Sequence, residues 1–216
     1  MVIASQPVQE VSIDIGIHPS VRQLKYHSRM PRLPYSRVLV YGVTGSGKTT
    51  LARKIGEKTG IEWHSVDDLT WDPGWQQVPV DEQRRRMQAI CDGDRWILDT
   101  AYGTWRDIPL ARVELIVALD YPRWLSFKRL LARSIMRAID KRPICNGNME
   151  SFRLMFSKES ILFWHFKSFK SKKTRIRDWA RKTDGPKILR FTRPRDVEAW
   201  LNSLTEPALD TDHAGV

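Results

Sequence analysis

The sequence predicts a three-layer α/β domain in which helices cover both faces of a five-stranded parallel sheet. Short runs of β-branched and aliphatic residues alternate with longer helix-forming stretches along the chain, which is the order expected for a parallel sheet. The chain has 216 residues, 41% of them hydrophobic, enough to build one such core. A basic stretch after the fourth apolar run predicts a helical lid insertion at about 126–170.

Five apolar runs are the candidate strands of this sheet. They occupy residues 38–41, 61–64, 95–99, 113–120 and 187–191. Helices are expected between and after them, at 49–58, 81–91, 122–139, in a basic segment that reaches residue 182, and at 195–204. Gly60 and the Gly185–Pro186 pair are typical helix ends. A loop rich in Trp, Asp and Pro is expected after the second strand.

This domain is expected to span residues 36–204. Residues 1–35 predict an N-terminal extension with one candidate edge strand, and residues 205–216 predict a disordered tail. No apolar stretch approaches the roughly 20 residues of a membrane helix, and no signal-peptide pattern is recognisable. We therefore expect a cytoplasmic protein without a membrane segment.

The charge of the chain is strongly positive and unevenly distributed. The formal net charge is +11, and from residue 121 to residue 195 basic residues outnumber acidic ones by 21 to 5. Such an excess predicts an anionic partner, for which nucleotides, nucleic acid and acidic membrane surfaces all qualify. The two cysteines are too few for a disulfide framework or a zinc site.

Residues 42–49 carry the strongest chemical signal, the pattern Gly-x-x-x-x-Gly-Lys-Thr between a predicted strand and a predicted helix. The glycines let backbone N–H groups turn toward phosphates, and the helix offers its positive N-terminal end. Lys48 is expected to reach the β and γ phosphates of ATP or GTP. Thr49 is expected to coordinate magnesium through its hydroxyl group. This P-loop pattern therefore predicts a nucleotide site.

Carboxylates follow three of the predicted strands. Asp99 ends the third strand and is interpreted as a magnesium-side carboxylate, with a helix or turn cap as the alternative. Asp67 and Asp68 follow the second strand, at the edge of a parallel sheet where ligands collect. Asp68 is the preferred acceptor-side residue of the two, and a simple turn remains the alternative. Asp120 is expected to cap the following helix.

Arginines repeat along the predicted helix after the fourth strand. Arg129, Arg133 and Arg137 are spaced by four residues and therefore share one face, and Arg142 lies in the loop beyond. Clustered guanidinium groups repel one another unless an anion answers them, which favours a lid over the phosphates. A solvated basic face is the alternative.

A later stretch combines basic and aromatic residues. Its members are Phe163, Trp164, Phe166, Lys167, Phe169, Lys170, Lys172, Lys173, Arg175 and Arg177. The pattern could grip nucleic-acid phosphates. The preferred interpretation is that the aromatic residues pack inward while the lysines stay solvated.

The order of these motifs resembles small P-loop kinases of the adenylate kinase-like group, most closely the bacterial branch of adenylate kinase-related "DNA topology modulation" proteins. The resemblance covers about residues 37–204. Besides the glycine motif it rests on Asp-Asp-Leu-Thr-Trp-Asp-Pro-Gly-Trp at 67–75, Arg-Trp-Ile-Leu-Asp at 95–99, Asn-Gly-Asn-Met-Glu-Ser at 146–151 and Thr-Arg-Pro-Arg-Asp-Val at 192–197. The Pro-Gly-Trp and Asn-Gly-Asn-x-Glu elements are the narrower signals.

The resemblance implies ATP and Mg²⁺ as cofactors and assigns site residues. Those that would bind the ATP phosphates are Gly42, Val43, Thr44, Gly45, Ser46, Gly47, Lys48, Thr49 and Thr50. Asp68 would face the acceptor, Asp99 the magnesium, and Arg106 the acceptor phosphate. The implied lid arginines are Arg133, Arg137 and Arg142. Arg193 and Pro194 would lie beside the adenine.

The expected function is magnesium-dependent transfer of the ATP γ-phosphate to a small acceptor, most simply a nucleotide. Thr44 stands where adenylate kinases carry proline, so the acceptor need not be AMP. The alternative is a regulatory or nucleic-acid-associated protein that binds ATP without kinase turnover. The basic segment favours that alternative, whereas Asp68, Arg106 and the lid arginines favour phosphoryl transfer.

Overall fold

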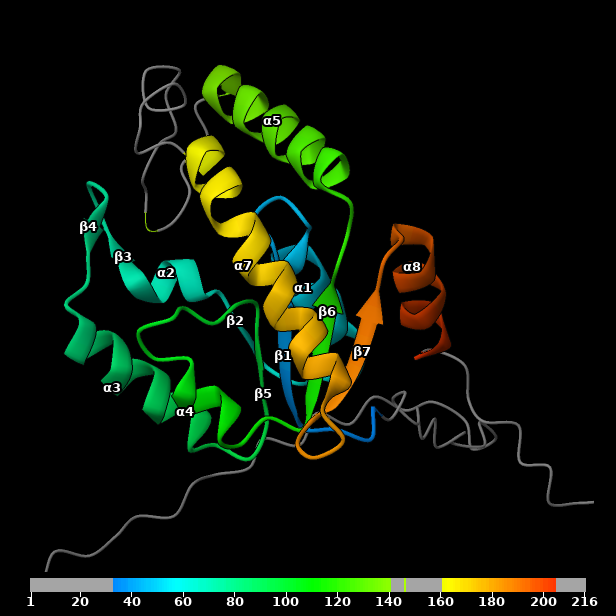
Figure 1. Cartoon of the computed structure of the whole chain (residues 1–216). Coiled ribbons are helices and arrows are strands. Elements are labelled where there is room, and N and C mark those ends of the chain that lie inside the picture. The colour runs from blue at the N-terminus through cyan, green and yellow to red at the C-terminus, as the bar shows by residue number, and fades with distance from the viewer. Residues whose placement is uncertain (1–32, 141–145, 147–160, 205–216) are drawn as a thin grey trace, which may run out of the picture.

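The computed structural model describes residues 33–140, 146 and 161–204, so nearly all of the predicted N-terminal extension and the whole predicted tail lie outside the described residues. Figure 1 shows the elements along the chain. In order they are β1 (Arg37–Gly42), α1 (Lys48–Thr59), β2 (Trp63–His64), α2 (Val66–Thr70), β3 (Trp71–Asp72), β4 (Gln76–Gln77), α3 (Val80–Cys91), β5 (Trp96–Leu98), α4 (Asp107–Leu110), β6 (Leu115–Leu119), α5 (Arg123–Asp140), α7 (Ile161–Arg181), β7 (Lys187–Phe191) and α8 (Pro194–Ser203).

The five predicted strands form one sheet with the order β2-β5-β1-β6-β7, and every pairing in it is parallel. Leu39 of β1 lies opposite Leu98 on one side and Ile116 on the other. The central strands are buried on both faces, which explains why their sequences are continuously apolar and do not alternate. The prediction of a five-stranded parallel sheet is confirmed.

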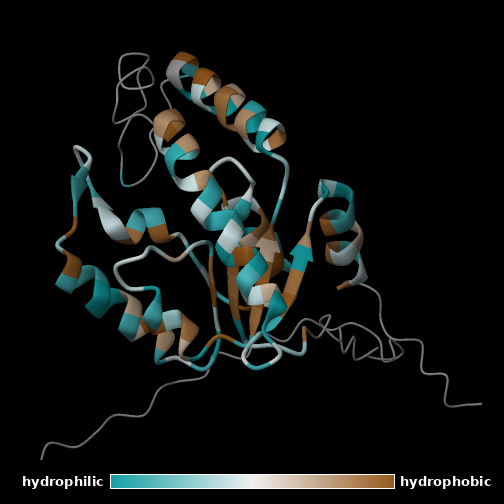
Figure 2. Cartoon of the chain, viewed as in Figure 1, coloured by the Kyte–Doolittle hydropathy of each residue, from teal (hydrophilic) through white to brown (hydrophobic). Residues whose placement is uncertain are grey.

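Helices cover both faces of the sheet, as the three-layer prediction requires (Figure 1). On one face α3, α4 and α7 bury Met87, Ile108 and Ile176 against the strands. On the other face α1 and α8 contribute Ile55 and Leu201. Figure 2 shows the hydrophobic strands enclosed by these helices. No helix in the described ranges is long and apolar enough to cross a membrane.

The loop predicted after the second strand contains more structure than expected. Helix α2 and the β3–β4 hairpin occupy it, with Thr70 Oγ1 donating to the Val66 carbonyl at 2.9 Å. Gly74 and Trp75 turn the hairpin with φ angles of 80° and 58°. The rings of Trp71 and Trp75 meet edge to face. Elements this short contain too few residues to show a periodic pattern, so the sequence did not predict them.

The predicted lid region contains α5 and the first half of α7, which lie side by side beyond the strands (Figure 1). Phe127 of α5 contacts the rings of His165 and Phe166 at centroid distances of 5.9 and 5.1 Å. Residues 141–145 and 147–160, between these helices, lie outside the described residues.

The prediction that the α7 aromatic residues pack inward is wrong for most of them. Phe163, Trp164 and Phe166 are about half exposed, whereas Phe169 is buried. The exposed ones lie in the part of α7 that extends past the sheet, where no strand is available to cover them. The expectation that the lysines stay solvated is also wrong for Lys173, whose side chain is only 17% exposed.

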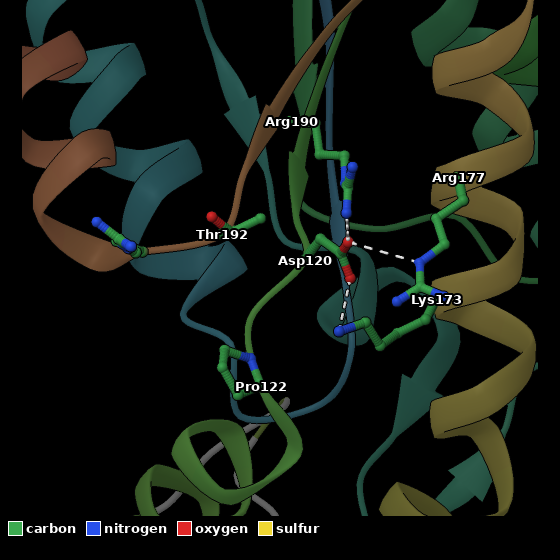
Figure 3. Close-up of a pocket in the computed structure, with 7 residues that line it drawn as sticks. Asp120, Pro122, Lys173, Arg177, Arg190 and Thr192 are labelled. Carbon is green, nitrogen blue, oxygen red and sulfur yellow. Dashed lines mark hydrogen bonds and ion pairs between the residues drawn. The ribbon is translucent and has the colours of Figure 1, made fainter.

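Asp120 was expected to cap α5, but it forms a buried ion-pair cluster instead. Helix α5 begins at Arg123, so the Pro122 carbonyl takes the capping position and accepts from Leu125 N at 3.2 Å. The Asp120 carboxylate, 1% exposed, lies 2.6 Å from Arg190 Nη2 and 2.9 Å from Lys173 Nζ. Figure 3 shows the carboxylate between these side chains. The cluster therefore fastens α7 and β7 to the end of β6.

We predict that Asp120→Ala lowers the free energy of unfolding by about 2 kcal/mol, because charged hydrogen bonds are lost and two cations lose their partner. Urea denaturation measures the change. The matched control is Asp178→Ala, since the Asp178–Arg181 pair on α7 is 55% and 79% exposed. That control should change stability by less than about 0.5 kcal/mol. Equal effects of the two substitutions would contradict the structural role of Asp120.

Candidate functional site

The glycine loop, residues 42–49, connects β1 to α1 at the carboxyl edge of the sheet. Gly45 and Gly47 have φ angles of 80° and 93°, a region that other residues rarely adopt. Gly47 occupies the N-cap position of α1, where no side chain caps the first helical N–H groups. The loop therefore presents unsatisfied donors at the positive end of a twelve-residue helix, which suits a phosphate.

The loop also holds polar side chains that a phosphate would satisfy. Lys48 Nζ donates to the Val43 carbonyl at 3.0 Å. Burial lowers the pKa of Lys48, while the charges of Asp99 and Asp67 act in the opposite direction. Ser46 Oγ is buried and forms no hydrogen bond within the described chain. These groups fit the phosphates of a bound nucleotide.

A hydroxyl and a carboxylate meet beside Lys48. Thr49 Oγ1 donates to Asp99 Oδ2 at 2.5 Å, and Val66 N donates to Asp99 Oδ1 at 3.0 Å. Asp99 is 3% exposed, and burial raises the pKa of its carboxyl group. This arrangement fits magnesium, which usually takes one or two protein ligands together with substrate phosphates and water. The described residues contain no group of three or more His, Cys, Asp or Glu that could form a metal cage.

Asp67, rather than Asp68, is the aspartate that faces this site. The charge of Asp67 acts on Lys48 and Asp99, and its carboxylate accepts a hydrogen bond from the Tyr102 hydroxyl. Asp68 is exposed, and its carbonyl accepts from Asn146 Nδ2 at 2.7 Å. The two residues are adjacent on the short helix α2, so a prediction from sequence cannot distinguish their directions. Asp67 is therefore a further candidate for the acceptor side, and the role predicted for Asp68 stays a prediction.

Helix α5 lies directly against the glycine loop. A Cβ atom at Gly45 would lie 2.3 Å from the Ser126 carbonyl oxygen, so only glycine allows this approach. Arg129 Nη1 donates to the Ser46 carbonyl at 3.5 Å, and the charge of Arg133 acts on Lys48. The structure thus brings the first two members of the predicted arginine face to the loop.

The other predicted basic residues are less closely tied to the loop. Arg137 follows Arg133 by one turn of α5, and Arg142 lies outside the described residues. Arg106 precedes α4, where its charge acts on Asp107. Arg193 is the N-cap residue of α8, and Pro194 is the first residue of that helix. The roles predicted for these residues stay predictions.

Helix α7 brings to the loop two residues, His165 and Lys172, for which the sequence predicted no role at that place. His165 Nδ1 lies 3.0 Å from the Thr44 carbonyl, and the His165 ring is buried. Lys172 lies where the charges of Lys48 and Asp67 act on it, with its Nζ 6.0 Å from the centre of the Tyr41 ring. A sequence signal for Lys172 existed: it falls between the buried residues Phe169 and Ile176 at helical spacing.

The pKa of Lys172 is also shifted by its surroundings near the loop. Burial, followed by repulsion from Lys48, lowers the pKa of Lys172 to about 7. Attraction by Asp67 opposes this change, and repulsion from Arg175 adds to it. Burial makes the charged form of a lysine costly, and an anion beside the lysine makes that form favourable again.

Comparisons with known proteins do not assign the chain to a family. No family model and no curated protein matches it. Among solved structures, a gluconokinase from Sinorhizobium meliloti 1021 has 17% identity and a TM-score of 0.47, over 80% of this chain and 93% of that one. A sugar kinase from Janibacter sp. HTCC2649 has 21% identity and a TM-score of 0.43, and the match covers 79% of this chain and 95% of that one. A shikimate kinase from Bacteroides thetaiotaomicron has 12% identity and a TM-score of 0.47, and the match covers 78% of this chain and 96% of that one.

We predict that binding of MgATP draws a proton onto Lys172 at about pH 8, because the phosphates raise its pKa above 7. Affinity for MgATP should therefore be highest below about pH 7 and fall as the pH rises, since more Lys172 must then be protonated on binding. Calorimetry in buffers of different ionisation enthalpy measures the uptake.

Lys172→Met should abolish this proton uptake. Lys170→Met is the matched control, because Lys170 is exposed on the same helix and should leave the uptake unchanged. Equal uptake by the wild-type protein and the Lys172→Met variant would show that Lys172 does not respond to the nucleotide.

Proposed function

We propose that this protein catalyses magnesium-dependent transfer of the ATP γ-phosphate to a small acceptor. One observation carries the proposal: the Thr49 hydroxyl and the buried Asp99 carboxylate meet at 2.5 Å, beside the uncapped N-terminus of α1 and Lys48. A phosphate-binding loop needs only the helix end and the lysine. A carboxylate in contact with the loop threonine adds the means to position magnesium, which phosphoryl transfer requires.

The donor side is built from residues of the loop and of the two helices packed on it. Bound magnesium and ATP would supply the phosphoryl group and neutralise part of its charge. Thr49 and Asp99 would hold the metal, while the α1 N–H groups and Lys48 orient the phosphates. Arg133 and Lys172 add positive charge within electrostatic reach of Lys48, which would stabilise charge on the moving phosphoryl group.

On the acceptor side, Asp67 is the carboxylate available to accept the proton of a substrate hydroxyl. It lies within electrostatic reach of Lys48, Asp99 and Lys172. The Tyr102 hydroxyl donates to it and so fixes its orientation. Asp68 and Arg106 remain proposed contacts of the acceptor on the strength of the family resemblance. Asp68 is next to Asp67 on α2, and Arg106 is the N-cap residue of α4.

Water exclusion would come from α5 and α7. Helix α5 contacts Gly45 of the loop, and His165 of α7 contacts Thr44. Transfer to an acceptor competes with transfer to water, so a kinase needs its phosphates covered. Arg137 and Arg142 belong to this proposed cover, and Arg193 and Pro194 are proposed neighbours of the adenine.

A second candidate function is nucleotide-dependent binding of nucleic acid without phosphoryl transfer. It is favoured by Trp164 and Phe166, which are about half exposed beside the exposed Lys167 and Lys170. Aromatic side chains that alternate with cations can stack on bases and contact phosphates. The two functions make different demands on α7, because Lys172 faces the loop whereas Lys167 and Lys170 face solvent.

We predict that Lys48→Ala weakens ATP binding by at least about tenfold, close to 1.4 kcal/mol. A neutral side chain cannot replace the charge beside the phosphates.

Asp99→Asn should keep the melting temperature yet lower magnesium-dependent turnover by about 10–100-fold. Asp94→Asn, exposed ahead of the same strand, serves as the control. Full activity of Asp99→Asn would return Asp99 to a capping role.

The acceptor class is tested by incubating the protein with [γ-³²P]ATP, magnesium and a panel of nucleoside monophosphates, sugars and small hydroxy acids. The proposal expects one class to be phosphorylated. Lys172→Met should then lower turnover by at least about tenfold, and Lys167→Gln/Lys170→Gln should leave it nearly unchanged. If no acceptor is phosphorylated and the double variant loses salt-sensitive binding to an oligonucleotide, the second function is correct.

A further inference from the structure

A groove runs along α7, the helix that covers one face of the sheet together with α3 and α4 (Figure 1). Its volume is about 630 Å³, within the range of small-ligand sites. Its lining residues lie between positions 167 and 182, and only Arg175 and Trp179 among them are half-buried, whereas the others are exposed. These two side chains therefore form the floor of what we call the α7 groove.

The floor of the α7 groove adjoins the proposed acceptor side through Tyr41. Arg175 Nη1 donates to the Tyr41 hydroxyl at 2.8 Å, and the Trp179 ring meets the Tyr41 ring edge to face at 4.8 Å. Tyr41 belongs to the hydrophobic cluster on which Tyr102 packs, and the Tyr102 hydroxyl donates to Asp67. One packed cluster thus connects the groove floor with the carboxylate on the acceptor side.

Lys172 links the same two places by charge. It precedes Arg175 by three residues on α7, which is about 4.5 Å along the helix axis. The charges of both Asp67 and Arg175 act on Lys172, and its Nζ lies 6.0 Å from the centre of the Tyr41 ring. A single small molecule can therefore reach from Asp67 past Lys172 to Arg175.

The charge of Arg175 is not compensated within the described part of the chain. Its hydrogen bond there goes to the neutral Tyr41 hydroxyl, and it forms no ion pair with a described carboxylate. Asp178, the carboxylate among the lining residues, instead pairs with Arg181 at 3.7 Å. A guanidinium group has five N–H donors and binds a carboxylate or a phosphate through pairs of hydrogen bonds. Arg175 thus keeps donors for an anion at the groove floor.

We propose that Arg175 determines acceptor specificity by binding an anionic group of the acceptor, which is a small alcohol with a carboxylate or phosphate of its own. This inference rests on the proposed function, because it concerns the acceptor of the same phosphoryl transfer. The acceptor hydroxyl oxygen bonds to the γ-phosphorus, and the bond from that phosphorus to the β–γ bridging oxygen breaks. ADP leaves with the electron pair of the broken bond, and the hydroxyl proton passes to Asp67. Arg175 holds the other end of the acceptor throughout.

The family resemblance assigns an acceptor phosphate to Arg106 instead, so the two arginines are competing hypotheses. Arg106 is the N-cap residue of α4, where its charge acts on Asp107. Arg175 is favoured because its hydrogen bond to Tyr41 joins it to the cluster that also holds the partner of Asp67.

The test compares neutral and anionic acceptors in matched pairs: a polyol with the sugar acid of equal chain length, and a sugar with its monophosphate. Turnover of the full chain with MgATP should show kcat/KM at least about tenfold higher for the anionic member. Arg175→Gln should abolish this preference, with KM for ATP changed by less than about twofold. Arg175→Lys, which keeps the charge but not the paired donors, should retain part of the preference.

Three further variants separate anion binding from other roles. Tyr41→Phe removes the hydroxyl that Arg175 contacts but keeps the guanidinium group, and Arg181→Gln removes a 79% exposed charge of the same helix outside the groove lining. Both should keep the preference within about twofold. Its loss in Tyr41→Phe would give Arg175 a purely structural role, and its loss in Arg181→Gln would mean that net charge alone attracts the acceptor. Loss in Arg106→Gln but not in Arg175→Gln would place the anion at Arg106. Each of these results overturns the proposal, as does a rise in KM for ATP that accounts for the whole effect of Arg175→Gln.

Calorimetry distinguishes failure of this inference from failure of the proposed function. The anionic acceptor is titrated into protein that holds a non-hydrolysable ATP analogue, so the glycine loop is already filled. Arg175-dependent binding without any transfer would refute the kinase but support the anion site. Equal turnover of neutral and anionic members would support the kinase and overturn the role of Arg175. Neither binding nor transfer would refute both.

The same measurements identify the anionic group. A preference of at least about tenfold for the sugar acid assigns a carboxylate, the reverse preference assigns a phosphate, and equal use shows that Arg175 accepts either. Transfer only to a nucleoside monophosphate, whose phosphate oxygen is itself the acceptor atom, would keep the kinase and overturn the alcohol as acceptor class.

Discussion

The glycine loop can bind phosphate only if its backbone stays fixed while its N–H groups remain free, and the surrounding structure meets both conditions by close contact. Gly42 approaches β6 so closely that an added Cβ would lie 2.9 Å from the Leu119 carbonyl oxygen. A Cβ atom added at Gly45 would likewise lie too close to α5, 2.3 Å from the Ser126 carbonyl oxygen. His165 contacts the Thr44 carbonyl from α7. Three elements therefore hold the loop through its carbonyl side and its glycines, which leaves the donor groups of α1 uncapped.

The same contacts explain how positive charge collects without destabilising the fold. Lys48, Arg133 and Lys172 would repel one another if no carboxylates lay between them. Asp99 and Asp67 supply the compensation, and burial lowers the pKa of both lysines. The lowered pKa of Lys172 reduces the repulsion among these cations. An anionic ligand reverses that balance, so binding and protonation are linked.

Much of this architecture could be predicted from sequence because it depends on local patterns. The five strands are continuous apolar runs, and the glycine motif lies between a strand and a helix as expected. Asp99 was identifiable because a strand end fixes where the next side chain lies. Asp67 and Asp68 were not distinguishable, since their directions depend on the five-residue helix α2 and on Tyr102, 35 positions away. Asp120 was misjudged because its partners Lys173 and Arg190 are remote in the chain.

Helix α7 shows most clearly what a one-dimensional pattern leaves undetermined. Its basic and aromatic composition does not say which side chains face the sheet, because the helix runs past the strands and is covered along only part of its length. Once Phe169 and Ile176 fix its rotation, Lys172 points toward Lys48 and Asp67, and Lys173 points toward Asp120. Neighbouring residues on one helix differ by about 100° in direction, so two adjacent lysines can serve two different anionic environments. A displacement of α7 would therefore change the contacts of the glycine loop and the ion pairs of Asp120 together.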